Sequence, residues 1–206
     1  MYARSITITG DPSAMDQGIA YVRDEVMPAV MAMDDCIGLS TLVDRASGEC
    51  IVTSSWRSEE AMMASDVHLA PLRRRGGEIM GAAPQVEVWE VAVMHRDHPA
   101  PESACCRVVW MRLSNGDVGR GIELYRSALL PEVKALEGFC SASLLVNRAS
   151  GRACSTTTYD SREAMETSAD RAWAIRDAGI RDAGVDVVDV VECDLVLAHL
   201  RLPELV

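Results

Sequence analysis

Two aromatic residues that could stack on a planar molecule, Trp56 and Tyr159, lie 103 positions apart in similar surroundings. Each ends a strand-like run, and each is followed two positions later by a serine that could cap a helix. An aromatic ring at the end of a strand could contact a planar substrate, and packing in the core or at its rim is the alternative interpretation. The pair therefore marks one candidate ligand site in each half of the chain.

A histidine and a basic cluster follow the first of these aromatic residues. His68 lies twelve positions after Trp56, and Arg73 and Arg74 belong to the one basic cluster of an acidic chain. We therefore treat His68 and Trp56 as catalytic candidates, with His68 as the proton acceptor. Tyr159, Arg73 and Arg74 are the substrate-binding candidates, because arginines can hold an anionic group. The alternative is a surface histidine and a solvated helix end, where cations complement the helix dipole.

Hydroxyl groups occupy the third expected strand of each half, where a central strand normally carries valine or isoleucine. The segments are residues 53–55 (Thr-Ser-Ser) and 155–158 (Ser-Thr-Thr-Thr). We expect some of these hydroxyls to face a wet cavity. The alternative is that threonine serves strand propensity and its hydroxyl bonds another strand or buried water.

A tandem duplication must position these residues. The segment Arg-Ala-Ser-Gly at 45–48 returns at 148–151, and residues 45–65 match residues 148–168 at ten of twenty-one positions. Each repeat has about one hundred residues, near the common size of a domain. The predicted domains are residues 1–95 and 105–206. Residues 96–104 hold prolines and charges without periodicity and are predicted to be the linker.

Each repeat predicts the element order β-α-β-β-α-β, which is the ferredoxin-like order of an α+β fold. Period-two patterns indicate strands, and apolar residues three or four apart indicate helices. The first helix of each repeat contains a proline, Pro28 or Pro131, so a break is expected there. A second helix is expected from Ser58 to about Met80, and its counterpart from Ser161 to about residue 178.

Composition excludes several classes of function. A formal charge of −11 and a pI near 4.8 argue against nucleic acid as a partner, since backbone phosphates must be neutralised by lysine and arginine. Neither a signal peptide nor a membrane-spanning run is apparent, so we expect a cytoplasmic protein without a membrane partner. Seven cysteines without a Cys-x-x-Cys motif indicate neither a zinc site nor a disulfide framework, and reduced thiols are expected.

Three features together resemble the antibiotic biosynthesis monooxygenase family of the dimeric α/β-barrel superfamily. The segment Leu-Pro-Glu-Val at 130–133, leading to Glu-Gly-Phe at 137–139, looks like the family's Leu-Pro and Pro-Gly-Phe motif. An aromatic residue before a capped helix start recurs at 56–62 and 159–165. The third feature is the element order at about one hundred residues per repeat.

The resemblance implies that the two repeats form, within one chain, the barrel-like pseudo-dimer that separate chains usually form. We therefore expect a monomer, although a further homodimer is possible. It also implies a cofactor-independent monooxygenase, or a related enzyme, acting on a small aromatic or hydrophobic molecule. The alternatives are a non-catalytic protein that binds haem or another hydrophobic ligand, and a structural or regulatory duplicate without activity.

Haem degradation is the variant of this resemblance that would require a cofactor. His68 lies near where haem-degrading relatives place their iron-binding histidine, but those relatives also use an asparagine on the first strand. That strand reads Ile-Thr-Ile at 6–8 and Val-Trp-Met at 109–111, so no cofactor is expected.

Because the repeats differ at the candidate positions, we expect one half to bind ligand, and His68 favours the first half.

Overall fold

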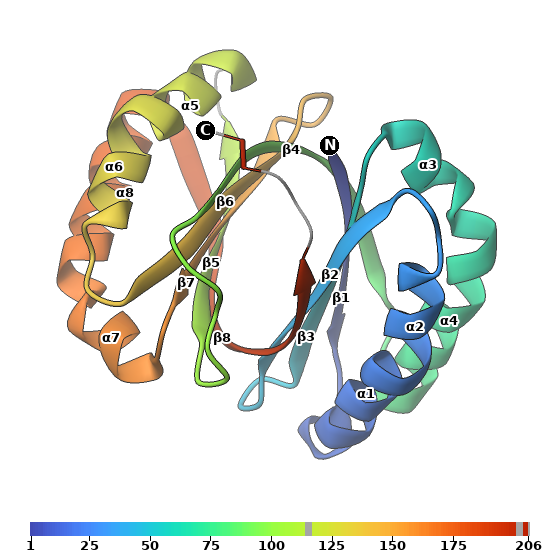
Figure 1. Cartoon of the computed structure of the whole chain (residues 1–206). Helices are drawn as coiled ribbons and strands as arrows, with labels where there is room; N and C mark the ends of the chain where they lie inside the picture. The colour runs from blue at the N-terminus through green and yellow to red at the C-terminus, as the bar shows by residue number, and fades with distance from the viewer. Residues whose placement is uncertain (114–116, 201–203, 206) are drawn as a thin grey trace. The chain divides into compact units, whose positions relative to one another are not determined.

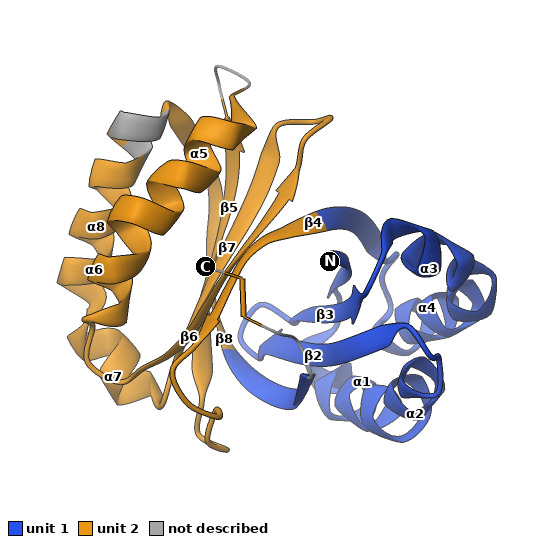
Figure 2. Ribbon diagram, turned by 45° about the horizontal axis from the view of Figure 1, so that its top comes forward, with its two compact units in different colours: residues 1–89, 194–202 blue, residues 90–193, 203–206 orange. Residues whose placement is uncertain are grey.

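A computed structural model of the chain describes residues 1–113, 117–200 and 204–205. Tertiary contacts divide the chain into two compact units. Unit 1 comprises residues 1–89 and 194–202, and unit 2 comprises residues 90–193 and 203–206 (Figure 2). No helix in the described part of the chain is long and apolar enough to cross a membrane.

Unit 1 is a sheet with its helices on one face (Figure 1). The central strand β3 (Glu49–Trp56) pairs antiparallel with both β1 (Tyr2–Thr9) and β2 (Cys36–Asp44). After a short 3-10 turn at Pro12–Ala14, the helices are α1 (Met15–Tyr21), α2 (Met27–Met31), α3 (Glu59–Ala64) and α4 (Asp66–Met80). The Ser58 side chain caps α3 by accepting from the Ala61 amide, as its position after a strand predicts.

Unit 2 repeats this plan. Its central strand β7 (Arg152–Tyr159) pairs antiparallel with both β5 (Cys105–Leu113) and β6 (Phe139–Asn147). The helices are α5 (Val118–Leu124), α6 (Leu130–Lys134), α7 (Arg162–Thr167) and α8 (Ala169–Ala183), and they cover one face of the sheet (Figure 1). Ser161 caps α7 as Ser58 caps α3.

Two long strands complete the sheets. Residues 90–96 of β4 (Gln85–Arg96) pair with β6, and residues 194–200 of β8 (Val185–Leu200) pair with β2. The eight strands are hydrogen-bonded in the closed order β1-β3-β2-β8-β5-β7-β6-β4. Two β-α-β-β-α-β halves with this closed order confirm the predicted fold class, a duplicated α+β chain of the dimeric α/β-barrel type. Because β4 and β8 each divide between the units, the compact units and the sequence repeats differ at their ends.

Proline shapes the first helix of each unit in the same way. α1 and α5 pass into π turns at Val22–Val26 and Tyr125–Leu129, and α2 and α6 then begin with Pro28 and Pro131 in their first turns. Proline is tolerated in a first turn because the amide that it lacks would have no partner inside the helix. The capping residues on both sides of each π turn keep right-handed helical dihedrals, so the irregularity expected at the proline takes the form of a π turn within a continuous helix, a feature often found at functional sites.

The second helix of each unit is interrupted, which corrects the single helix expected from Ser58 to Met80. The break is at Ser65, whose hydroxyl donates to the Met62 carbonyl at 2.7 Å and accepts from the Arg4 guanidinium at 3.0 Å. A serine hydroxyl that binds a backbone carbonyl competes with the helical hydrogen bond to it. Ser168 stands at the same break in unit 2, where α8 then runs five residues past the expected end, to Ala183.

Gly138 is required by both its backbone and its neighbours. Its φ is +66°, and a Cβ added there would lie 2.5 Å from the Cβ of Ala164 on α7. Gly81, at the end of α4, has a similar φ of +73° but nothing within 4 Å of such a Cβ. An alanine at position 81 would therefore meet the cost of the backbone conformation alone. An alanine at position 138 would meet that cost and a steric clash as well.

We expect Gly138→Ala to lower the free energy of unfolding by more than Gly81→Ala does. The left-handed conformation alone costs an L-residue about 1–2 kcal/mol, so Gly81→Ala should cost that amount and Gly138→Ala distinctly more. Urea denaturation followed by circular dichroism measures both. An equal loss of unfolding free energy in the two variants would show that α7 moves away from the added methyl group without a free-energy cost.

Candidate functional site

Each unit has a partly open cavity between its sheet and its helices. The cavity of unit 2 has a volume of about 110 Å³, and that of unit 1 about 60 Å³. An engineered apolar cavity of about 150 Å³ holds benzene, so the unit 2 cavity is close to the size of one small ring. Its walls are mainly aliphatic and come from β5, β6, β7, α5 and α8, with Val109, Met111, Leu113, Ile122, Leu144 and Ile175 among the lining residues.

Arg107 on β5 provides a buried cation in the wall of the unit 2 cavity. Its side chain, in a residue that is 4 % exposed, donates to Glu192 Oε1 through Nε at 2.9 Å and Nη2 at 2.8 Å. Nη2 also reaches the Met165 carbonyl at 3.3 Å, and Nη1 donates to the Tyr159 hydroxyl oxygen at 3.4 Å. The Tyr159 hydroxyl accepts from Arg107, so its own proton is available to a ligand.

Trp173 on α8 lines the same cavity and lies against two cations. The Arg107 guanidinium carbon is 4.5 Å from the Trp173 ring centroid, and that of Arg176 is 4.3 Å away. Cation–π contacts of this kind are favourable within about 6 Å of the ring centroid. The cavity therefore has a cationic, aromatic region beside its aliphatic walls.

Tyr125, the first residue of the π turn, carries a hydroxyl that the protein leaves without a hydrogen-bond partner among the described residues. The residue is 6 % exposed and lines the unit 2 cavity. Burial raises the pKa of Tyr125 to about 12, although the nearby Ser155 opposes that shift without forming a hydrogen bond of normal geometry. At neutral pH the Tyr125 hydroxyl is therefore a protonated donor that a ligand could satisfy.

We expect Tyr125→Phe to stabilise the ligand-free protein, because an unsatisfied buried polar group costs about 1–3 kcal/mol. Tyr21 is the matched control. It is also buried against helix α4, but its hydroxyl donates to the Leu72 carbonyl at 3.2 Å. Tyr21→Phe should therefore destabilise the protein. Thermal unfolding should show a higher melting temperature for Tyr125→Phe and a lower one for Tyr21→Phe than for the unaltered chain. A loss of stability in Tyr125→Phe would mean that a water already satisfies the hydroxyl.

The equivalent polar groups of unit 1 bind one another. Arg4 corresponds to Arg107 and is 2 % exposed, but its guanidinium contacts Ser65 Oγ at 3.0 Å, the Met62 carbonyl at 2.7 Å and Asp66 at 3.4 Å. It does not line the unit 1 cavity. In both units this arginine binds the carbonyl before the helix break. Of the two arginines, Arg107 also lines the cavity of its unit.

The structure separates the candidates that the sequence placed together in the first half. Trp56 is 1 % exposed and donates from Nε1 to Ser54 Oγ at 3.1 Å, so it belongs to the core. His68 is exposed on α4 and lines neither cavity. Arg73 lines the unit 1 cavity and pairs with Asp66 at 2.7 Å, whereas Arg74 is exposed and borders a shallow surface groove.

Of the predicted site residues, Tyr159 alone lines the unit 2 cavity. Of the strand residues with hydroxyl groups, Ser155 and Thr157 line the unit 2 cavity and Ser54 lines that of unit 1. Sequence reasoning missed Arg107 and Trp173. The repeat register carried a signal for the former, because Arg4 and Arg107 are 103 positions apart and an arginine inside an apolar strand needs a partner.

Comparison with known proteins gives close relatives by sequence. No family model matches the chain. The chain is 52% identical over 206 residues to the uncharacterized protein Rv2557 of Mycobacterium tuberculosis, covering 100% of this chain and 92% of that protein. It is 49% identical over 207 residues to the uncharacterized protein Rv2558 of the same organism, with 100% and 88% covered.

Solved structures share the fold over nearly the full length. An anthrone oxidase-like protein superposes with a TM-score of 0.64 at 15% identity, covering 97% of this chain and 93% of the other. A ferredoxin-fold protein related to antibiotic biosynthesis monooxygenases, from Listeria monocytogenes, gives 0.54 at 12% identity, with 99% and 95% covered. The haem-degrading enzyme LmHde of the same organism also gives 0.54, at 10% identity, with 93% and 98% covered. The chain therefore has an antibiotic biosynthesis monooxygenase-like fold in duplicated form, and it belongs to the family of the Mycobacterium tuberculosis proteins Rv2557 and Rv2558.

Proposed function

We propose that the chain binds a small aromatic molecule carrying an anionic oxygen in the unit 2 cavity, and that it oxidises this molecule with O₂ as a cofactor-independent monooxygenase. The observation that carries the proposal is the set of buried donors in an apolar cavity. Arg107, Tyr159 and Tyr125 supply a guanidinium and two hydroxyls, and one of the hydroxyls has no partner among the described residues.

The chemistry assigned to these groups is stabilisation of a phenolate or enolate. Donors that are fixed in a water-poor cavity stabilise developing negative charge better than mobile water does. An electron-rich anion can react with O₂ without a cofactor. One oxygen atom enters the substrate as a carbonyl, and the second oxygen atom leaves as water with two hydrogens of the substrate. The substrate supplies all four electrons that O₂ accepts.

The proposal assigns the site to unit 2, which reverses the preference that His68 gave to the first half. The unit 2 cavity is larger, and Arg107, Tyr125 and Tyr159 are among its lining residues. Arg4 and Arg107 both bind protein groups, but Arg107 lines the cavity of its unit and Arg4 does not. The Tyr21 hydroxyl donates to a backbone carbonyl, whereas the Tyr125 hydroxyl has no partner among the described residues. Tyr159 remains a substrate-binding candidate, and Arg107 takes the role that Arg73 and Arg74 had as the cation for an anionic group.

A non-catalytic binding protein is the second candidate, and one observation favours it. The described residues that line the unit 2 cavity include no histidine, aspartate or glutamate, so no general base contacts a ligand there. A turnover mechanism then requires a substrate that ionises before it binds or loses its proton to solvent. The same absence of histidine, together with a volume near that of one ring, supports a small ligand over haem.

Binding and oxidation can be tested on the same protein. Single-ring phenols, benzoates and quinols, followed by fused-ring anthrone, would be titrated while the fluorescence of Trp173 is monitored, with Trp173→Phe identifying its signal. Oxygen consumption with each compound that binds then measures turnover. Binding with oxygen consumption supports the monooxygenase, binding alone supports the second candidate, and no binding by any compound would contradict both. A cytoplasmic location and a monomeric state remain part of the proposal.

A further inference from the structure

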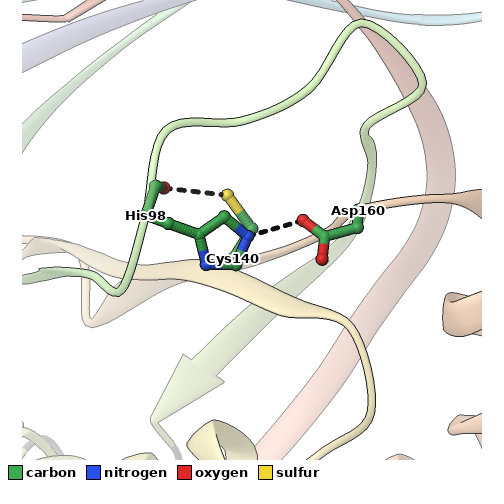
Figure 3. Close-up of side chains that lie close together, drawn as sticks. All are labelled: His98, Cys140 and Asp160. Carbon is green, nitrogen blue, oxygen red and sulfur yellow. Dashed lines mark hydrogen bonds and ion pairs between the residues drawn. The ribbon is translucent and has the colours of Figure 1, made fainter.

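A histidine, a cysteine and an aspartate lie close together in unit 2 (Figure 3). His98 lies in the segment between β4 and β5, Cys140 is the second residue of β6, and Asp160 directly follows β7. One ligand atom from each of the three lies within 4.8 Å of the other two. None of the three lines the unit 2 cavity, so the cluster is independent of the proposed function.

The hydrogen bonds of the cluster orient the imidazole as a metal ligand. His98 Nε2 is 2.7 Å from Asp160 Oδ1, and His98 Nδ1 is 3.4 Å from Asp97 Oδ2. In protein metal sites, a ligating histidine usually gives its other ring N–H to a carboxylate, which fixes the tautomer and the ring orientation. Asp97 stands in that outer position, and Nε2 faces the other two potential ligands.

The fold does not require this combination of side chains. The strand registers place Phe139 opposite Tyr159 and Cys36 opposite Trp56, so Cys140 and Asp160 correspond to Ile37 and Arg57 in unit 1. The backbone at the site is the same in both units, since the Asp160 amide donates to the Gly138 carbonyl as the Arg57 amide donates to that of Asp35. One repeat therefore folds with an isoleucine and an arginine where the other has two potential metal ligands.

A catalytic cysteine–histidine pair does not fit the geometry. The Cys140 thiol donates to the backbone carbonyl of His98 at 3.3 Å, and both ring nitrogens of His98 face carboxylates. No ring nitrogen is left to accept the thiol proton. A cation placed between the three side chains would be compatible with all of them.

We propose that His98, Cys140 and Asp160 bind a divalent zinc-type ion through Nε2, Sγ and one carboxylate oxygen. Imidazole, thiolate and carboxylate are the groups through which proteins bind Zn²⁺. Small movements of these three side chains would bring one ligand atom of each to coordination distance from an ion. The thiol proton and the proton shared by His98 and Asp160 leave to solvent, and no electron is transferred. The side chains of His98 and Asp160 are 39% and 40% exposed, so water completes the coordination. The ion would tie the segment after β4 to β6 and to the end of β7.

Cobalt provides a direct test on the full chain. After chelator treatment and dialysis, Co²⁺ should bind with one equivalent and give the near-ultraviolet charge-transfer absorption of a thiolate–cobalt bond, which Zn²⁺ should then remove. Cys140→Ser should abolish that band, while Cys36→Ser, at a buried cysteine of unit 1, should leave it unchanged. Asp97→Asn should keep the band and weaken the Co²⁺ affinity roughly 10- to 100-fold, as loss of an outer partner does.

Two further variants guard against misfolding of the buried cysteine variant. Cys140→Ile introduces the residue of unit 1, and His98→Gln changes a side chain that is partly exposed, so both should fold and neither should bind the ion tightly. The exposed His68→Gln should bind normally. The proposal is overturned if the unaltered chain gives no charge-transfer band, or if the band persists in Cys140→Ile. Equal Zn²⁺ affinity in His98→Gln and the unaltered chain would overturn it as well.

Discussion

An Ala153→Leu variant is expected to lose ligand binding completely while keeping or raising its thermal stability. Ala153 lies on β7, is 5 % exposed and lines the unit 2 cavity. A leucine there would occupy space that a ligand needs. Each extra buried CH₂ group contributes about 0.8 kcal/mol when it fills a void without strain. Filling the cavity should therefore favour the folded state and exclude the ligand.

Cys50→Leu is the matched control for this experiment. Cys50 stands 103 positions before Ala153, lies on β3 and lines the smaller cavity of unit 1. If the ligand binds in unit 2, Cys50→Leu should leave the affinity unchanged, as fluorescence titration and calorimetry can determine. Loss of binding only in Cys50→Leu would move the site to unit 1. Loss in both variants would point to a ligand bound elsewhere.

The fold was predictable because the repeat and its turns are local signals. Gly48 and Gly151 both adopt positive φ in the hairpins, and Ser58 and Ser161 both cap helices, as their sequence contexts indicate. The interruptions at Ser65 and Ser168 were not predicted. The Ser65 hydroxyl donates to a carbonyl within its own helix and the Ser168 hydroxyl to the Glu137 carbonyl, and helical propensity alone reveals neither bond.

The site was less predictable, because its residues meet only in the folded unit. Tyr159 was found through the repeat, but Arg107 on β5 and Trp173 on α8, which line the same cavity, belong to other elements of the fold. Trp56, the equivalent aromatic residue, donates its indole N–H to Ser54 and does not line the unit 1 cavity. Sequence similarity between the repeats thus identified equivalent positions and could not tell which one faces a cavity.

The same limit applies to metal ligands. No zinc motif is visible in the sequence, because the proposed ligands His98, Cys140 and Asp160 come from three separate parts of the chain rather than from a short Cys-x-x-Cys segment. Duplication helps once a structure is known, because unit 1 shows which features the fold itself needs. Arg4 and Arg107 both bind the carbonyl before the helix break, whereas Arg107 also lines the cavity of its unit and Arg4 does not.

The positive charge of Arg107 in the candidate site should change the pKa of a phenol that binds there. para-Nitrophenol is a single-ring probe, and its anion absorbs visible light whereas the neutral form does not. Bound beside Arg107, Tyr159 and Tyr125, the probe should have a lower pKa than in water, because a guanidinium and hydroxyl donors stabilise the anion. Absorption by the anion should therefore persist below the pH at which the free probe becomes protonated.

Replacing Arg107 by methionine should reverse the sign of that shift. Without the guanidinium, burial disfavours the charged form, so the pKa of any bound probe should rise above its value in water. The affinity for the anion should fall roughly 10- to 100-fold, since a hydrogen bond to a charged group contributes about 1.5–3 kcal/mol. Arg4→Met removes the equivalent buried cation of unit 1, and it should reduce stability while leaving the pKa of the bound probe unchanged. A probe whose pKa is the same in the unaltered chain and in Arg107→Met would place the ligand away from Arg107 and remove the basis for anion stabilisation in unit 2.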